Sequence, residues 1–346
     1  MKRALRILLI TVATVLLLGL FLRNSDLRQV GKALGQIAPF WFVLALLTNF
    51  SALIFRTLRW RTILGGSSET TPPAYDTFLA TAIGFMSSAI LPIRAGDVVR
   101  PALLSRRTGI RFSKALGTVV SERIIDLVAV LSMFIVFSLT EGRDLAANPA
   151  TARKALVIQS AATIAAMALG GIVAMIILLW LFRGSTRSLQ IRVSTWLPKR
   201  FRRGWVGFFD SLVAALELAG KPRIAIRVLL FTIGIWSCLT GQFILVLYAM
   251  GRPLPYLSSF LVTGMTILSL SIPTPGGVGG VHKAAQLALT SFYGFDVNSS
   301  VAVAIVFHVV GTAPVLLTGL LLFAREGLSI RQLAKIGETI EEQGEG

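Results

Sequence analysis

The sequence predicts an all-α polytopic membrane protein with about six full spans and two re-entrant hairpins that proline and glycine break. Three observations predict this fold class. Of the 346 residues, 54% are hydrophobic and only 14% are charged, whereas an ordinary soluble domain carries roughly 25% charged residues. The apolar residues gather in long blocks, and a helix needs roughly 20 of them to cross a hydrocarbon core about 30 Å thick. The third observation is the excess of 34 Lys and Arg over 16 Asp and Glu, which is distributed unevenly between the predicted loops.

Six apolar blocks are long enough for full spans. They are residues 4–22, 38–55, 117–139, 155–182, 224–250 and 299–324. A signal peptide is the alternative for the first block, but no small-residue cleavage site follows Leu20, so we expect a retained helix. Two other apolar stretches, 77–92 and 257–273, are shorter, end in proline and run into a second half-apolar segment. We expect each of them to be one arm of a hairpin or broken helix.

The placement of basic residues predicts the orientation of the chain. With the N-terminus in the cytoplasm, the predicted cytoplasmic segments hold 24 of the 34 basic residues and the external segments hold 7. One of these cytoplasmic segments is 55–74. Because cytoplasmic loops are enriched in Lys and Arg, we expect a multi-pass protein of a bacterial cytoplasmic membrane with both termini inside. Most of the net charge of +18 then reflects topology and contact with anionic lipid, and we expect no nucleic-acid partner.

The chain is expected to form a single transmembrane domain, residues 1–346, with internal symmetry. Residues 38–140 and 226–324 both have the pattern helix, broken hairpin, helix, and the two hairpins enter from opposite sides. Inverted repeats of transporters have this form, and their Gly/Pro-interrupted segments mark the binding site. Residues 183–223 are predicted to be a cytoplasmic amphipathic linker, either in the membrane plane or packed on other helices. The acidic tail 336–346 is predicted to be disordered.

The first polar cluster follows a predicted break at Pro92. Gly96 permits a tight reversal there, and Arg94, Asp97 and Arg100 supply charges at the edge of an apolar segment. If a helix restarts near this glycine, Asp97 and Arg100 lie three residues apart on one face and can pair. A guanidinium is a strong donor to phosphate, so we expect Arg94 and Arg100 to hold a lipid phosphate.

A second set of charges lies at the start of the apolar block 117–139. Glu122 and Asp126 are four residues apart and share a helix face, while Arg123 points elsewhere. Charges at membrane depth are costly unless they are paired or hydrated, so we expect them to face a bundle interior or a water-filled cavity. They would balance the arginines or meet an amine on a headgroup. The alternative is a purely structural ion-pair network near the interface.

A glycine-rich loop interrupts the apolar segment of the second hairpin. Its members are Pro273, Pro275, Gly276, Gly277, Gly279 and Gly280. Irregular backbone at that depth is tolerated only where it lines protein or water. A half-helix beginning near Gly279 would present its N-terminus to an anion such as phosphate, and Lys283 one turn later would add a positive charge. A hinge or a tight helix crossing is the alternative.

The sequence offers little for other chemistry. His282, beside the loop, can titrate near neutral pH, and His308 in the last block is either an interhelical hydrogen-bonding group or a proton relay. With two histidines and one cysteine, Cys238, we expect no metal site and no internal disulfide. We also find no nucleotide-binding motif and expect no cofactor.

Three motifs together resemble a known family. They are Pro92-x-Arg94-x-Gly96-Asp97-x-x-Arg100, Glu122-Arg123-x-x-Asp126 and Pro275-Gly276-Gly277-Val278-Gly279. Their order and spacing resemble the lysylphosphatidylglycerol synthase transmembrane, or flippase-like, family over nearly the whole chain. The resemblance implies a membrane domain that moves an aminoacylated lipid between leaflets, and larger members add a cytoplasmic synthase domain. Asp97 stands where the family more usually has Glu, and His282 where an acidic residue commonly follows the loop.

These observations favour a lipid or lipid-linked-glycan translocator that moves an anionic or aminoacylated lipid. The expected ligand residues are Arg94, Asp97, Arg100, Glu122, Arg123, Asp126 and Lys283, with the glycine loop. The expected partners are membrane lipids, anionic phospholipid or polyprenyl-linked glycan, together with a second copy of the chain or a lipid-synthesis enzyme. We expect no enzyme activity, because no hydrophilic segment is long enough for a synthase domain. A membrane-bound transferase, a subunit or scaffold of an envelope-lipid biosynthesis complex and a proton-coupled transporter of small solutes are the alternatives.

Overall fold

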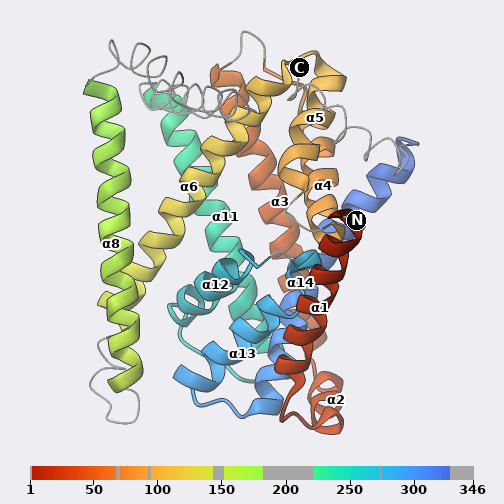
Figure 1. The fold of residues 1–346 in the computed structure, drawn as a ribbon, viewed down its shortest axis with the longest axis vertical. Coiled ribbons are helices and arrows are strands. Elements are labelled where there is room, and N and C mark those ends of the chain that lie inside the picture. Colours follow the sequence, from red (N-terminus) through yellow and green to blue (C-terminus); the bar gives the residue numbers. More distant parts are fainter. Residues whose placement is uncertain are drawn as a thin grey trace.

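The computed structural model describes residues 2–67, 71–91, 95–142, 152–181, 221–272 and 274–327, and these residues form an all-α membrane protein (Figure 1). The helices are α1 (Lys2–Leu22), α2 (Leu27–Gly35), α3 (Pro39–Ser67), α4 (Ala74–Ile90), α5 (Gly96–Thr108), α6 (Phe112–Leu139), α8 (Ala152–Leu181), α11 (Pro222–Ala249), α12 (Ser258–Ser269), α13 (Gly280–Phe292) and α14 (Val297–Arg325), with a 3-10 turn η1 (Pro275–Gly277). The predicted linker up to residue 220 and the predicted tail 336–346 lie outside the described residues.

Four of the described helices, α3, α8, α11 and α14, are long and apolar enough to cross a membrane. The other two predicted spans, 4–22 and 117–139, are also helical, as α1 and α6. Three charged side chains near the middle of α6 shorten its apolar stretch. Large apolar side chains are exposed on the outer faces of the long helices, for example Leu156 and Ile164 in α8 and Leu321 in α14. Such surfaces suit a lipid environment, where apolar side chains are not exposed to water.

Both breaks lie where proline and glycine predict them. The first hairpin consists of α4, which ends at Ile90, and α5, which begins at Gly96. In the second hairpin α12 ends at Ser269, the 3-10 turn η1 follows, and α13 begins at Gly280. Figure 1 shows α4 and α5 in the upper half of the molecule and α12 and α13 in the lower half. The hairpins therefore approach each other from opposite ends of the bundle.

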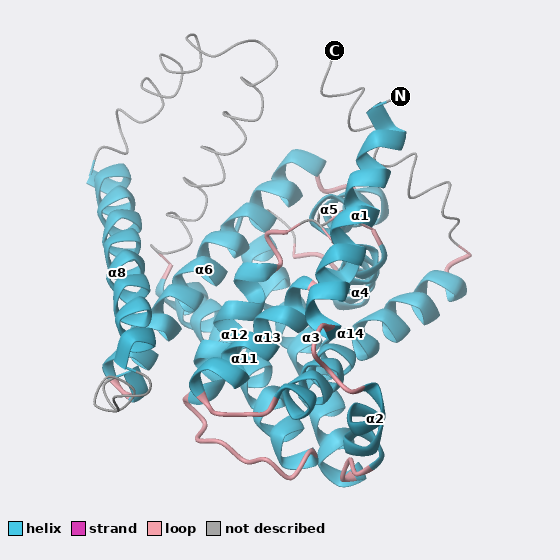
Figure 2. Cartoon of the chain, turned by 60° about the horizontal axis from the view of Figure 1, so that its bottom comes forward, coloured by secondary structure: helices cyan, strands magenta, loops and turns pink. Residues whose placement is uncertain are grey.

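The two helix–hairpin–helix units, α3 to α6 and α11 to α14, pack against each other. Their first helices, α3 and α11, pack along one another, and the buried Asn49 amide donates to Gln242 Oε1 between them at 2.7 Å. One arm of each hairpin packs on the other unit: α4 on α14 of the second unit, and α12 on α6 of the first. Helix α1 lies against α13, and α8 packs on α6 at the edge of the bundle (Figure 2).

A polar network ties α4, α5 and α14 together at one end of the bundle. Arg107 contacts Asp76 Oδ1 and Glu326 Oε2, both at 2.6 Å, and the Tyr75 hydroxyl donates to Glu326 Oε1 at 2.8 Å. The hydrogen bonds from Tyr75 and Arg107 lower the pKa of the Glu326 carboxyl. Because these groups are exposed, the network orients helix ends and adds little to stability.

The arms of the first hairpin cross at glycine. A Cβ atom on Gly96 would overlap the carbonyl oxygen of Gly84, and one on Gly84 would lie 2.7 Å from Arg100 Cβ. The backbone N–H of Gly96 also donates to Ser88 Oγ at 3.0 Å. This close approach places the start of α5, with Asp97 and Arg100, against α4.

Substitution of Gly96 by alanine is expected to lower the stability of the fold. The added methyl group meets backbone, which cannot move aside as a flexible side chain can, and overpacking of this kind costs about 1–3 kcal/mol. Thermal unfolding in detergent measures the change. Gly31→Ala in α2 is the control, because nothing lies within 4 Å of a Cβ there and alanine favours a helix interior. An unchanged melting temperature for Gly96→Ala would contradict the crossing geometry.

Candidate functional site

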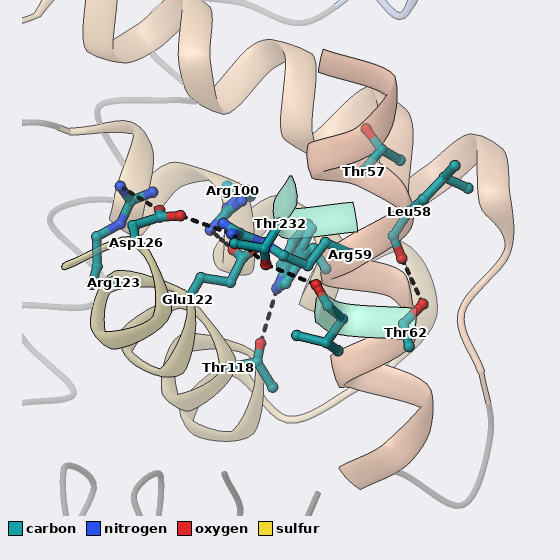
Figure 3. Close-up of polar contacts among 12 residues, drawn as sticks. Thr57, Leu58, Arg59, Thr62, Arg100, Thr118, Glu122, Arg123, Asp126 and Thr232 are labelled. Atoms are coloured by element: carbon teal, nitrogen blue, oxygen red, sulfur yellow. Dashed lines mark hydrogen bonds and ion pairs between the residues drawn. The ribbon is translucent and has the colours of Figure 1, made fainter. Parts of the chain in front are cut away.

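Six charged side chains from α3, α5 and α6 alternate in sign and form one continuous chain of ion pairs. Figure 3 shows five of them: Arg59, Arg100, Glu122, Arg123 and Asp126. In order, this ion-pair chain consists of Asp97, Arg123, Asp126, Arg59, Glu122 and Arg100. It runs from side chains that are about a third exposed to side chains that are almost fully buried. Its three arginines and three carboxylates leave it with no net charge.

The buried end of the chain centres on Glu122, whose side chain is 1% exposed. Its two oxygens bridge two arginines: Arg59 Nε lies 3.3 Å from Oε1, and Arg100 Nη2 bonds Oε2. The Arg100 guanidinium also lies 4.4 Å from the ring centroid of Trp60, whose indole N–H donates to Thr118. A carboxylate shared between two buried cations fixes α3, α5 and α6 relative to one another.

The outer end of the chain is accessible. Arg123 reaches Asp97 Oδ1 at 3.3 Å and Asp126 Oδ2 at 3.4 Å, and Asp126 Oδ1 accepts from Arg59 at 2.7 Å. The predicted pair between Asp97 and Arg100 is wrong, because the structure pairs each with α6 instead. The expectation that Arg123 points away from its neighbouring carboxylates is also wrong. Contacts between helices replace the Asp97–Arg100 pair because Glu122 neutralises the buried Arg100 and Arg123 neutralises the half-buried Asp97.

Arg59 is the ion-pair residue that sequence reasoning missed. The segment 55–74 was predicted to be a cytoplasmic loop, but α3 continues to Ser67 and Arg59 is 2% exposed within it. A hydropathy pattern ends a span at the first cluster of arginines. In this fold the carboxylates of α6 neutralise Arg59 inside the bundle, so the helix continues past it. Its partners lie 63 and 67 residues away in sequence, so no local pattern indicates them.

A cavity of about 720 Å³ lies beside the outer end of the ion-pair chain. Its volume is typical of small-molecule sites. Both units line it. The first contributes Arg56, Phe85, Ser88, Ala89, Asp97, Arg123 and Asp126, and the second contributes Trp236, Gln242, Thr263, Thr266, Thr274, Gly276, Gly277, His308 and Gly311, among others. Apolar side chains such as Val130, Leu239 and Phe307 complete the wall.

Arg56 contributes a positive charge to the cavity that the ion-pair chain does not neutralise. Among the described residues no carboxylate forms an ion pair with it, and its guanidinium lies 4.6 Å from the ring centroid of Phe85. A stacked guanidinium keeps its N–H groups free for a ligand. Arg56 was predicted to lie in a loop, for the same reason as Arg59.

The glycine loop brings the tip of the second hairpin against the first. Gly276 and Gly277 have φ values of 57° and 72° and line the cavity. A Cβ atom on Gly276 would lie 2.9 Å from the carbonyl oxygen of Ala89 in α4. Gly279, with φ 83°, caps α13 and faces Leu17 of α1. Gly276 and Gly277 therefore form part of the cavity wall, whereas Pro275 does not line the cavity and Gly279 and Gly280 start the half-helix.

The predicted anion site at the start of α13 does not share the cavity with the arginines. The Lys283 ammonium donates to Gln286 Oε1 at 2.7 Å and is not part of the cavity wall. His282 Nδ1 accepts from the Gly279 N–H at 3.4 Å, and its ring lies 4.3 Å from that of His308, which does line the cavity.

Several predicted groups stay untested by this geometry. Pro92, Arg94 and Pro273 lie outside the described residues. In the described part of the chain no group of three or more His, Cys, Asp or Glu side chains is placed to hold a metal ion.

Comparison with known proteins agrees with this architecture. The family model described as "Lysylphosphatidylglycerol synthase TM region" matches residues 4–319. A protein named glycosyltransferase AglD, from Haloferax volcanii, is 24% identical over 331 residues, which cover 90% of this chain and 52% of that protein. The chain thus spans about half the length of this relative. No solved structure matches the chain. Because the family model covers most of the sequence, the chain belongs to the lysylphosphatidylglycerol synthase transmembrane region family.

Proposed function

We propose that this protein moves a phosphate-bearing lipid, an anionic or aminoacylated phospholipid or a lipid-linked glycan, between the leaflets of a bacterial cytoplasmic membrane without a chemical step of its own. The observation that carries the proposal is the cavity between the two hairpin tips, which combines apolar walls with Arg56, a cation that no described carboxylate pairs. A lipid needs both kinds of surface: the cation for its headgroup and the apolar wall for the first part of its acyl chains.

The electrostatics support a phosphate as the group that is recognised. Arg56 and Arg123 both line the cavity, and guanidinium groups form strong, directional hydrogen bonds with phosphate oxygens. Arg123 is held in place by Asp97 and Asp126. Together with Arg56, the neutral ion-pair chain gives this cluster of described residues an excess of one positive charge, which complements the single negative charge of a phosphodiester.

The packing of each hairpin against the other unit supports movement by alternating access. Each hairpin packs on the last helix of the other unit, and the cavity lies where the tips meet. In transporters built from inverted repeats, one repeat rocks against the other around a central site. A similar motion here would open the cavity to one leaflet and then to the other.

Filling the cavity tests the proposal. A Cβ atom on Gly311 in α14 meets only Gln242 Nε2, at 3.8 Å, so Gly311→Phe places a ring in the cavity with little strain on the backbone. In liposomes with fluorescent phosphatidylglycerol on both leaflets, we expect the parent protein to move the lipid and Gly311→Phe to reduce the rate to that of protein-free vesicles. Gly170→Phe is the control, because Gly170 lies in α8, has nothing within 4 Å and does not line the cavity.

Equal rates for the parent and Gly311→Phe would exclude this cavity as the path. A parent protein that moves neither fluorescent phospholipid nor a labelled polyprenyl-phosphate sugar would contradict the translocator function itself. The second probe is included because the Haloferax relative is named a glycosyltransferase, which supports glycan lipids as candidates. Conversion of either probe to a new compound would point to an enzyme instead.

A further inference from the structure

Four residues that line the cavity each carry a buried side-chain N or O atom that has no hydrogen-bond partner among the described residues. Among the described residues, six buried side-chain N or O atoms have no partner, and four of them belong to residues that line the cavity. These four are Arg123 Nε, Trp236 Nε1, Thr263 Oγ1 and Thr274 Oγ1. Buried polar groups are nearly always hydrogen-bonded, because leaving one unpaired costs about 1–3 kcal/mol. Their concentration around one cavity indicates a polar ligand that supplies the missing partners.

The chemistry of these atoms specifies what they bind. The indole N–H of Trp236 only donates, and a threonine hydroxyl both donates and accepts. Three of the side chains carry no charge and are more than nine-tenths buried: Trp236 is 9% exposed, Thr263 3% and Thr274 7%. Neutral groups that accept and donate, such as the hydroxyls of a polyol or a sugar, satisfy such a set without bringing a buried charge.

The cavity is polarised between the two units. Its arginines and carboxylates come from α3, α5 and α6 of the first unit, whereas the three uncharged groups come from α11, α12 and the glycine loop of the second. A ligand that spans the cavity therefore meets cations at one end and neutral hydrogen-bonding groups at the other. A lipid phosphate followed by a hydroxylated headgroup has this polarity.

An ammonium group finds no free counter-charge in the described wall. Asp97 is paired with Arg123, and Asp126 is shared between Arg123 and Arg59. An aminoacyl headgroup would have to share a carboxylate that already neutralises an arginine, next to the uncompensated charge of Arg56. Desolvating a cation there without a partner is unfavourable.

We infer that the substrate is a phosphodiester lipid whose headgroup is uncharged and rich in hydroxyls, a polyol or glycan, and not an aminoacylated lipid. The phosphate binds Arg56 and Arg123, and the hydroxyls bind Trp236, Thr263 and Thr274. This inference rests on the proposed function and narrows the substrate class at the same cavity.

Three lipids with the same short acyl chains test it by equilibrium binding to the detergent-solubilised protein. Phosphatidylglycerol carries headgroup hydroxyls, phosphatidylethanol has the same charge without them, and lysylphosphatidylglycerol adds ammonium groups. We expect phosphatidylglycerol to bind about tenfold more tightly than either of the others, as the loss of one or two buried hydrogen bonds of about 1 kcal/mol each implies.

Isosteric variants assign the preference to the unpaired hydroxyls. Thr263→Val and Thr274→Val keep the side-chain volume and remove the hydroxyl, so both should bind phosphatidylethanol like the parent and lose the preference for phosphatidylglycerol. Thr290→Val is the control, because Thr290 in α13 does not line the cavity and donates its hydroxyl proton to the Gln286 carbonyl oxygen at 2.9 Å. It should keep the preference.

The outcomes separate the two proposals. Tightest binding of lysylphosphatidylglycerol, or a preference that survives both Thr263→Val and Thr274→Val, would overturn the inference while leaving the translocator function in place. A protein that binds none of the three lipids and moves none of them in liposomes would refute the proposed function, and the inference with it.

Discussion

Glu122→Gln is expected to destabilise the protein more than any other single substitution in the ion-pair chain. The carboxylate holds Arg59 and Arg100 together with both partners almost fully buried. The amide has the same shape, but its NH₂ group would face a guanidinium donor, and two buried positive charges would lose their shared counter-charge. Removing one partner from a buried ion pair costs about 3–5 kcal/mol. We expect a large fall in the melting temperature in detergent, with loss of the folded peak in size-exclusion chromatography.

The same chemical change at the outer end of the chain provides the control. The Asp97 side chain is 30% exposed and, among the described residues, forms its one ion pair with Arg123, so Asp97→Asn should cost no more than about 1 kcal/mol. A second substitution, Arg100→Gln in the Glu122→Gln background, should restore part of the stability because it removes the cation that Glu122 neutralised, whereas Arg59 keeps its ion pair with Asp126. If the two single acid-to-amide variants melt alike, Glu122 does not hold the three helices together.

The sequence predicts the skeleton of this fold well because its main signals are local. Apolar blocks of fixed length mark the spans, and Pro92 and the glycine loop mark the breaks through backbone chemistry that no neighbour can change. Gly276 and Gly277 show this directly, since their positive φ values are ones that glycine adopts without steric cost.

The site is harder to predict because its contacts are long-range. Hydropathy assigned Arg56 and Arg59 to a loop, since a local average does not detect carboxylates on a helix more than 60 residues away. Helical spacing suggested a pair between Asp97 and Arg100 that the packing of α6 replaces. Thr263 and Thr274 resemble ordinary residues of an apolar hairpin. Only the structure shows that they line a cavity and that their hydroxyls have no partner among the described residues.

Arg56→Gln is expected to have the largest effect on function with a small effect on folding. The side chain forms no ion pair with the described carboxylates, so its removal orphans no buried charge, and its contact with the Phe85 ring is lost. If Arg56 supplies the excess positive charge that holds the lipid phosphate, its loss removes a charge-assisted hydrogen bond of about 1.5–3 kcal/mol. Lipid binding should weaken about tenfold or more, and transfer in liposomes should slow accordingly.

Arg56→Lys and Arg61→Gln distinguish charge from geometry and from position. Lysine keeps the charge but cannot form a forked pair of hydrogen bonds, so it should restore part of the binding and make it more sensitive to salt. Arg61 lies on the same helix, donates to the Pro72 carbonyl oxygen at 2.9 Å and does not line the cavity, so Arg61→Gln should transfer lipid at the rate of the parent. If Arg56→Gln also does so with an unchanged melting temperature, the lipid phosphate is bound by other cations, and the excess charge of the cavity has another purpose.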